Sequence, residues 1–332
     1  MSATDTQASE PVPAVVDGQI LPPVNPVTRR EVSFASDGLR LAAHLYLPAG
    51  TRPAGGWPGL AMAGPMTSVK EETLPHYAVE LARAGFATLT FDNRNFGASE
   101  GRNPQHLNTA EQVEDLRNAV SYLVSHPDVN ADRIGLGCVC LGAGYGLEVA
   151  AMDPRVRAVA FVAGGYNITD TYLGFLGADG FASYMQTLAA GRQLEFSTGE
   201  AQFLPAVAGP PDYAPSSMPV REAFEYYTRA HDTEASSWQN RLTVRSMEQI
   251  IGWNVTGHAH LVTQPLIVVH GTTDVLLPPA YAQQVHDQAA STAKEMVWIT
   301  THNHVELYDQ APYVPQALAA ITPFLTAHLA DS

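Results

Sequence analysis

The sequence predicts an α/β fold built on a doubly wound, mostly parallel sheet. Short apolar stretches with the length of strands alternate with segments of helical spacing, first over residues 60–162 and again over 265–329. Such alternation with short connections is typical of parallel strands joined by right-handed crossovers. The composition agrees, because 45% of the 332 residues are hydrophobic and only 15% are charged. A chain of this kind can bury a sizeable core.

The first elements of the predicted fold form a β-hairpin. Strand-like segments at 31–34 and 39–47 flank Asp37-Gly38, a dipeptide typical of tight turns. Beyond the hairpin, apolar periodicity predicts strands and helices in turn. The strands are expected at 60–62, 87–91, 134–139 and 156–162, and the helices at 74–84, 109–124 and 142–151.

The alternation stops between residues 164 and 262 and then resumes. Strands are expected at 265–270 and 296–300, and helices at 280–290 and 314–329. We therefore predict a core made of residues 28–163 and 263–332. Residues 164–262 are rich in glycine, proline and aromatic residues, and we expect them to form a cap or lid over a ligand pocket.

The aromatic residues of the predicted cap are candidate substrate contacts. We single out Tyr226, Tyr227 and Trp238. The alternative is that such aromatics form a small core of the cap itself. At the other end of the chain, residues 1–27 contain five prolines among small and acidic residues. This composition predicts an extended or disordered arm outside the catalytic core.

The charge balance limits the partners. The chain has 18 lysines and arginines against 33 acidic residues, a net charge of −15, so we expect neither nucleic acid nor an anionic membrane as partner. No apolar run reaches 18 residues, and residues 1–10 lack the layout of a secretory signal. The two cysteines, Cys138 and Cys140, are poorly placed to bridge each other. We expect a cytoplasmic protein, and the sequence leaves open whether it forms a homodimer.

Cys140 is the candidate nucleophile. It lies between the predicted buried strand at 134–139 and a helix that begins with small residues at 142–144. Small residues allow close packing, and the helix N-terminus supplies N–H groups and a positive dipole end that favour a thiolate. A cysteine nucleophile needs such surroundings. Cys138, in contrast, is expected to be a buried, unreactive side chain.

A second motif offers a serine instead. Residues 97–101, Gly-Ala-Ser-Glu-Gly, match the pattern G-x-S-x-G. The nucleophile elbow that this pattern describes has a strand directly before the serine and a helix directly after it. Ser99 has loop-like sequence on both sides, so we expect it to be structural.

The general base and the acid that orients it are expected after the last two strands. Asp274 follows one of these strands, and His302 and His304 follow the next. The order nucleophile, acid, histidine is one in which catalytic triads occur. Asp274 could instead cap a turn, and the pattern by itself does not separate His302 from His304.

Two H-x-H pairs raise the alternative of a metal site. They are His258 with His260 and His302 with His304, and alternate residues on a strand share a face that can bind zinc. No carboxylate lies at helical ligand spacing, and the pairs fall in the predicted cap and in a loop. We therefore expect no metal and no cofactor, and a small molecule as substrate.

These motifs together resemble the α/β-hydrolases of the dienelactone-hydrolase-like group, near the branch of bacterial peptidase-like hydrolases and fungal polyketide transferases. The matching segments are Val-Lys-Glu-Glu at 69–72, the loop at 91–99, Asp-Arg-Ile-Gly at 132–135, and His-Val-Glu-Leu-Tyr-Asp at 304–309. In relatives the last motif begins with the catalytic histidine, which favours His304. The resemblance implies an α/β-hydrolase fold with a triad of Cys140, His304 and Asp274.

The α/β-hydrolase frame also implies an oxyanion hole made of two backbone N–H groups. One donor would be Leu141, and the other would be Met66, because the preceding Pro65 has no N–H. The chain departs from the group at two positions. Cys138 stands where a glycine usually lies two residues before the nucleophile, and Asn95 replaces another usual glycine.

The expected activity is acyl transfer through a cysteine. The leading hypothesis is a hydrolase that attacks a small, fairly apolar ester, lactone or thioester and releases the acyl group to water. The alternative is a transferase or lyase on the same scaffold, acting on a polyketide-like natural-product intermediate. A ligand-binding member without catalysis is a third hypothesis, which an intact nucleophile, acid and histidine argue against.

Overall fold

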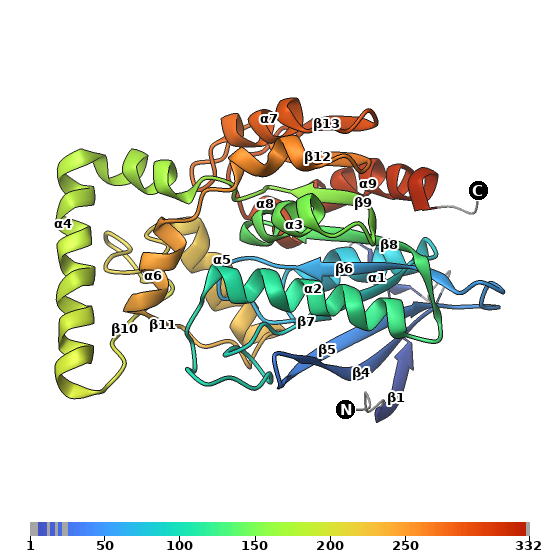
Figure 1. The fold of residues 1–332 in the computed structure, drawn as a ribbon, viewed down its shortest axis with the longest axis horizontal. Helices are drawn as coiled ribbons and strands as arrows, with labels where there is room; N and C mark the ends of the chain where they lie inside the picture. The colour runs from blue at the N-terminus through green and yellow to red at the C-terminus, as the bar shows by residue number, and fades with distance from the viewer. Residues whose placement is uncertain (1–5, 12–13, 17–18, 22–25, 330–332) are drawn as a thin grey trace.

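A computed structural model describes residues 6–11, 14–16, 19–21 and 26–329. Within these residues the centre is a nine-stranded sheet in the order β1-β4-β5-β7-β6-β8-β9-β12-β13 (Figure 1). The pairs from β1 to β7 are antiparallel, and those from β7 to β13 are parallel. The strands are β1 (Thr6–Pro11), β4 (Val27–Ser36), β5 (Leu39–Pro48), β6 (Trp57–Ala63), β7 (Ala87–Phe91), β8 (Val129–Val139), β9 (Val156–Val162), β12 (Leu266–Gly271) and β13 (Lys294–Ile299). The predicted mostly parallel, doubly wound sheet is confirmed.

The predicted hairpin is the antiparallel pair of β4 and β5. Its register runs from Val27 opposite Pro48 to Ser36 opposite Leu39. Asp37 and Gly38 form the turn with φ values of 49° and 81°. A two-residue turn with positive φ at both positions matches the twist of the strands that it joins.

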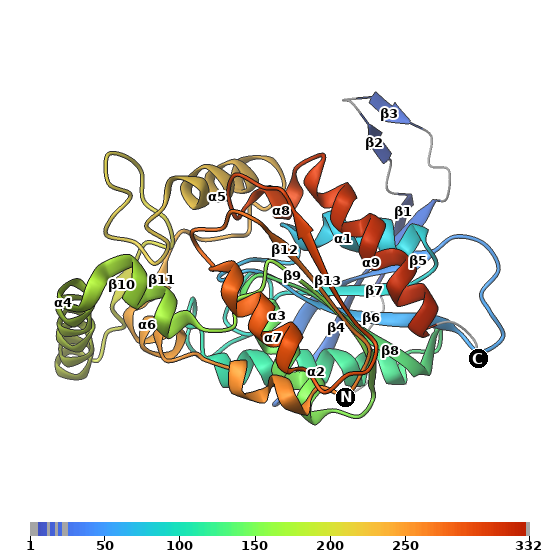
Figure 2. The same ribbon diagram turned by 90° about the horizontal axis from the view of Figure 1, so that it is seen from above.

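Helices cover both faces of the sheet. They are α1 (Leu74–Arg83), α2 (Thr109–Ser125), α3 (Leu141–Met152), α7 (Pro279–Gln288), α8 (Glu306–Asp309) and α9 (Tyr313–Leu329). In Figure 2, α1, α8 and α9 lie on one face and α2, α3 and α7 on the other. Every residue of β7 and of β12 is buried. This burial explains why β12 begins as a continuous apolar run rather than as an alternating pattern, whereas in β7 the two buried threonines donate to backbone carbonyls.

The chain between β9 and β12 forms a largely helical layer. Its elements are α4 (Ile168–Thr198), β10 (Phe203–Leu204), α5 (Arg221–Thr233), β11 (Leu242–Thr243), α6 (Val244–Ile251) and η1 (Thr256–Leu261). Figure 1 shows this layer beyond one end of the sheet, with α4 outermost. The helix α4 is interrupted at Gly177, where φ is 65°. We call residues 164–262 the cap; the division into core and cap stays a prediction.

The N-terminal residues add short strands before the core. β1 pairs antiparallel with β4 at the edge of the sheet, and β2 (Ala14–Val16) pairs with β3 (Gln19–Leu21). The prediction of an extended or disordered arm at 1–27 falls in part on residues outside the described ones. Among the helices that the structure describes, none combines the length and the apolar composition that crossing a bilayer requires.

Candidate active site

Cys140 stands at a sharp turn between β8 and α3. Its φ of 58° and ψ of −128° lie outside the regions that non-glycine residues favour. Three backbone hydrogen bonds hold this conformation: the Cys140 N–H donates to Val162 O at 3.0 Å, and its carbonyl accepts from Ala143 N at 3.0 Å and Gly165 N at 2.8 Å. The geometry is that of a nucleophile elbow, which presents the side chain at the end of the sheet.

His304 and Asp274 lie at the same end of the sheet. His304 Nδ1 is 2.6 Å from Asp274 Oδ2, and both side chains are buried. Asp274 Oδ1 accepts from the Leu277 N–H at 2.7 Å. One carboxylate oxygen therefore caps a turn while the other binds the imidazole. This bond places the proton of a neutral imidazole on Nδ1, and Nε2 is then free to accept a proton.

Asp274 and His304 stabilise each other's charged forms. Burial by itself opposes the imidazolium, but the Asp274 carboxylate and then the Cys140 side chain outweigh it and raise the pKa of His304 well above its ordinary value. Burial likewise opposes the Asp274 carboxylate, but the positive charge of His304 and a hydrogen bond from His270 lower the pKa of Asp274. The site therefore stabilises an imidazolium beside Cys140.

The rival side chains lie elsewhere. The side chain of His302 is 78% exposed, and its ring contacts Glu306. Ser99 lies in a loop, where its Oγ donates to Asp92 O at 2.6 Å and accepts from the Ala42 N–H at 2.8 Å. Neither side chain contacts Cys140.

The two departures from the usual glycines have local explanations. A Cβ at Gly146 of α3 would lie 2.9 Å from Cys138 Sγ, so the side chain of Cys138 fits because a glycine faces it. Burial raises the pKa of the Cys138 thiol to about 12, which keeps it protonated. Asn95 has a φ of 73°, a conformation that asparagine tolerates better than most residues, and its side chain donates to His106 O at 2.8 Å.

The two expected oxyanion donors flank the elbow. Leu141 is the first residue of α3, and Met66 lies in the loop after β6, beside the cavity described below. In the described part of the chain, neither N–H donates to a protein acceptor. The Gly142 N–H, by contrast, donates to Gly64 O at 3.0 Å. This bond joins the start of α3 to the loop that carries Met66.

Tyr226, Tyr227 and Trp238 do not line the cavity beside Cys140. They are buried against the loop that carries Met66. Two of them donate hydrogen bonds to this loop, and the third bonds to the residue before α1. Tyr227 Oη donates to Met66 O at 2.7 Å, and Trp238 Nε1 donates to Thr67 Oγ1 at 3.2 Å. Tyr226 Oη shares a hydrogen bond with Thr73 Oγ1, just before α1. The three residues therefore hold the loop in place, and other side chains line the cavity.

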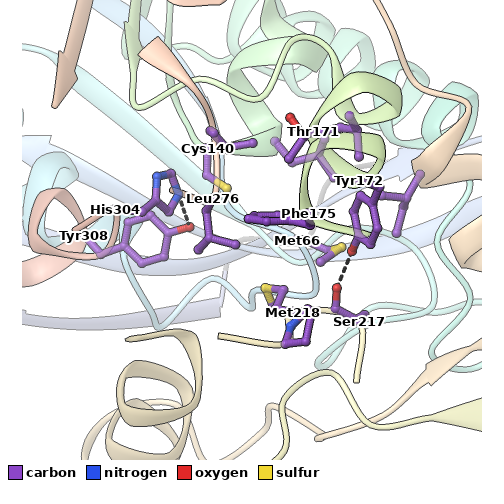
Figure 3. Close-up of a pocket in the computed structure, with 15 residues that line it drawn as sticks. Met66, Cys140, Thr171, Tyr172, Phe175, Ser217, Met218, Leu276, His304 and Tyr308 are labelled. Atoms are coloured by element: carbon purple, nitrogen blue, oxygen red, sulfur yellow. Dashed lines mark hydrogen bonds between the residues drawn. The ribbon is translucent and has the colours of Figure 1, made fainter. Parts of the chain in front are cut away.

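A mostly apolar cavity opens beside the Cys140 sulfur (Figure 3). It encloses about 490 Å³ of space between protein atoms, including open solvent at its mouth. Its lining is Met66, Cys140, Leu141, Ile168, Thr171, Tyr172, Phe175, Ser217, Met218, Pro219, Ile250, Leu276, Leu277, His304 and Tyr308. No carboxylate, lysine or arginine belongs to this described lining, so the cavity suits an uncharged group.

Tyr308, which the sequence pattern did not single out, shares this site. Tyr308 is 2% exposed, and its hydroxyl is 2.9 Å from His304 Nε2. The spacing of four residues between His304 and Tyr308 could have revealed the contact, since side chains at i and i+4 of a helical segment are neighbours. The cavity residues of α4 and of the loop before α5 carried no such signal.

The H-x-H pairs do not gather around a common point. His258 contacts Glu148, and His260 Nδ1 contacts Gly257 O, while His302 and His304 have the separate partners given above. In the described part of the chain, one other group, His76 with Glu234 and Asp309, brings three possible ligand atoms within 4.8 Å of one another. Asp309 there already pairs with Arg229 at 2.6 Å, and the group lies outside the cavity lining.

Comparison with known proteins places the chain among the α/β-hydrolases. A family model described as serine aminopeptidase, S33, matches residues 70–311. The uncharacterized protein YcjY of Escherichia coli (strain K12) is 28% identical over 309 residues, covering 89% of this chain and 97% of YcjY. Polyketide transferase af380 of Aspergillus fumigatus is 27% identical over 285 residues, covering 85% of this chain and 92% of af380.

A solved structure shows the same fold. The crystal structure of α/β-hydrolase GrgF from Penicillium sp. sh18 aligns with a TM-score of 0.74 at 24% identity, covering 91% of this chain and 99% of that chain. The fold class predicted from the sequence is thereby confirmed, and the expected relatives among polyketide transferases are found. The family match spans more than half of the chain and includes Cys140, Asp274 and His304. The chain is therefore an α/β-hydrolase enzyme and belongs to the family described as serine aminopeptidase, S33.

Proposed function

We propose that the protein hydrolyses a small, fairly apolar ester, lactone or thioester through an acyl-enzyme on Cys140. The observation that carries this proposal is the buried hydrogen bond of 2.6 Å between His304 Nδ1 and Asp274 Oδ2, next to a cysteine held in an elbow. A nucleophile, a base and an acid that orients the base are the parts that covalent acyl transfer requires. A reducing compartment such as the cytoplasm would keep Cys140 as a thiol.

The proposed reaction begins with transfer of the Cys140 proton to His304. The thiolate attacks the carbonyl carbon, and the N–H groups of Leu141 and Met66 stabilise the oxyanion that forms. Collapse expels the alcohol or thiol, which takes a proton from His304. Water then gives a proton to Nε2 and attacks the thioester carbonyl. The C–S bond breaks, the carboxylic acid is released, and the Cys140 sulfur takes the proton back from Nε2. Asp274 stabilises the imidazolium in both halves of the reaction.

The cavity supports an uncharged, largely apolar acyl group. Met218, Phe175 and Leu276 surround the space in front of the Cys140 sulfur (Figure 3). An ammonium group would lose hydration there without gaining a partner of opposite charge, and a carboxylate would find only the His304 imidazolium beside Cys140. The hydroxyl groups of Thr171 and Tyr172 also belong to the lining. Tyr172 already donates to Ser217 O, which leaves little polar capacity for a polar acyl chain.

Transfer to an acceptor other than water is the second candidate. Residues of the cap cover the cavity, and a covered site can exclude water while an acyl-enzyme waits for its acceptor. The relative af380, named a polyketide transferase, agrees with this alternative. Both candidates share the acyl-enzyme and differ only in the group that resolves it.

The test follows the acyl group. We would incubate wild type, Cys140→Ala and Cys138→Ala with a panel of medium-chain esters, lactones and thioesters, and detect the adduct by mass spectrometry. We expect an acyl group on Cys140, no turnover in Cys140→Ala, and near wild-type turnover in Cys138→Ala. In H₂¹⁸O the released carboxylate should carry one label. Turnover by Cys140→Ala would refute the proposal, and an unlabelled product with an acylated acceptor would select the transferase.

A further inference from the structure

The hydroxyl of Tyr308 lies beside the nitrogen of His304 that exchanges the proton in the proposed reaction. It lies 2.9 Å from Nε2 of His304, the nitrogen that faces away from Asp274. The Tyr308 ring is fixed by edge-on contacts, at a centroid distance of 5.1 Å from the His304 ring and 4.9 Å from the Tyr226 ring. With 2% of the residue exposed, the hydroxyl has little freedom to leave this position.

The hydroxyl also faces the nucleophile. Figure 3 shows the Cys140 sulfur and the Tyr308 oxygen directed toward the same space in the cavity. Cys140 is close enough to influence both partners, because after burial its side chain is the next cause that raises the pKa of Tyr308. A tyrosine whose pKa lies well above its ordinary value stays protonated, so its O–H remains available as a donor.

The hydroxyl of Tyr308 can form hydrogen bonds in either protonation state of His304. When the imidazole is neutral, its proton lies on Nδ1 toward Asp274, so Nε2 must accept and the Tyr308 O–H must donate. When His304 is an imidazolium, Nε2–H donates to the Tyr308 oxygen, and the Tyr308 proton can then point at the Cys140 sulfur. In both states Tyr308 connects the other two side chains.

We propose that Tyr308 is a fourth catalytic residue, which relays the proton between Cys140 and His304 and then donates a hydrogen bond to the thiolate. This proposal rests on the proposed role of Cys140. In the forward step the S–H bond of Cys140 breaks as its proton moves to the Tyr308 oxygen, and the Tyr308 proton moves to Nε2. The products are a thiolate, a neutral tyrosine and an imidazolium, so charge and protons balance.

The same relay can run in reverse when the leaving group departs. The expelled alkoxide or thiolate takes the proton of the Tyr308 O–H, and Nε2–H returns a proton to the Tyr308 oxygen. Leaving groups that are poor need this proton most. The role of Tyr308 should therefore be larger for an alkyl ester than for an activated aryl ester.

Other titratable groups face this relay and affect its pH dependence. Asp274 binds Nδ1, and His270 lies 3.4 Å from the same carboxylate oxygen. From α5, Glu222 Oε1 accepts from the His304 backbone N–H at 3.1 Å, and burial raises the pKa of Glu222. A pH profile of the wild type alone would report on several of these groups at once. A pair of matched variants is therefore needed to isolate Tyr308.

The test compares Tyr308→Phe with Tyr145→Phe. Tyr145 is also buried near Cys140, but in the described part of the chain its hydroxyl has no hydrogen-bond partner. We would measure the rate of iodoacetamide alkylation of Cys140 from pH 5 to pH 10. Losing one donor to a thiolate should move the midpoint for Tyr308→Phe upward by about one pH unit, or about tenfold in reactive thiolate. Tyr145→Phe should match wild type.

Steady-state kinetics provide the second measurement. Tyr308→Phe should lower kcat by about 10- to 100-fold, more for an ethyl ester than for the p-nitrophenyl ester of the same acid, with KM within about twofold of wild type. If Tyr308→Phe does not fold, a fluorinated tyrosine placed at position 308 keeps the ring and hydroxyl. Its lower phenol pKa makes it a stronger donor, so the alkylation midpoint should move downward.

The outcomes separate this inference from the proposed function. A folded Tyr308→Phe with an unchanged alkylation profile and unchanged kcat, while Cys140→Ala is inactive, would overturn the relay and leave the acyl-enzyme standing. Full activity in Cys140→Ala would overturn both. A change in KM alone would assign Tyr308 to substrate packing and would also overturn the relay.

Discussion

A methyl group at position 142 should separate the two halves of the proposed oxyanion hole. A Cβ built on Gly142 lies 2.2 Å from the carbonyl oxygen of Ala63 and 2.8 Å from that of Gly64. Both obstacles are backbone atoms, so no side-chain rotation can relieve the contact. The Gly142 N–H also donates to Gly64 O at 3.0 Å. Gly142→Ala must therefore push the start of α3 away from the loop after β6.

The size of this displacement follows from the structure. Real Cβ contacts essentially never fall under 3.0 Å, so the distance of 2.2 Å must grow by 3.0 − 2.2, or about 0.8 Å. Leu141 moves with α3 and Met66 stays with the loop, so at least one hydrogen bond to the oxyanion leaves the range of 2.7–3.1 Å. Losing one such donor costs about 10²- to 10³-fold in kcat, or about 2.7–4 kcal/mol.

The assay compares Gly142→Ala with Gly137→Ala. Gly137 lies in β8 close to the same elbow, but a Cβ there would meet Met62 at ordinary distances of 3.4 and 3.7 Å. We expect kcat for an ester substrate to fall about 100-fold or more in Gly142→Ala and less than threefold in Gly137→Ala. Alkylation of Cys140 by iodoacetamide should proceed at a similar rate in both. A folded Gly142→Ala enzyme with kcat within threefold of wild type would refute the assignment of Leu141 and Met66.

Three further predictions concern the groups around the site. Tyr227→Phe removes the hydroxyl that holds the Met66 carbonyl, so kcat should fall by about tenfold with KM nearly unchanged; a selective rise in KM would instead indicate substrate contact. His304→Gln should lower kcat by about 10³-fold or more, whereas His302→Gln, at an exposed position, should stay within about twofold; equal losses in folded protein would contradict the choice of His304. Burial raises the pKa of the Glu72 carboxyl well above 4.5, so its contribution to stability is full below pH 4.5 and is lost as the pH rises through the higher folded-state value. The free energy of unfolding of Glu72→Gln, measured with urea and relative to wild type, should therefore rise between pH 4 and pH 8; a constant difference would show that Glu72 does not titrate in this way.

The core of the fold could be predicted because its central strands β7 and β12 are short and buried on both faces. The apolar run expected at 265–270 corresponds to β12 at Leu266–Gly271, and the strand expected at 87–91 corresponds to β7. Parallel strands also place their C-terminal ends at one edge of the sheet. Residues that follow different strands, such as Cys140, Asp274 and His304, could thus be expected at one site although more than 160 positions separate the first from the last.

The roles of individual cap residues could not be predicted in the same way. Apolar and aromatic character indicates that a side chain is buried, but not which surface buries it. Tyr227 and Trp238 are buried against the loop of Met66, whereas Tyr172 and Met218 face the cavity. Nothing in their local sequence separates these two pairs, because the distinction depends on how the cap packs on distant loops.

The packing of the cap has a consequence for how this enzyme selects substrates. Met66 supplies one proposed oxyanion donor, and its carbonyl accepts a hydrogen bond from Tyr227 of the cap helix α5. Other cap residues, Phe175 and Met218 among them, line the cavity beside Cys140. An acyl group that shifts the cap must therefore also shift the loop that carries the donor. Because misplacement of a reacting group by about 1 Å can cost about 10²-fold in rate, a poorly fitting substrate should be discriminated through kcat as well as through KM.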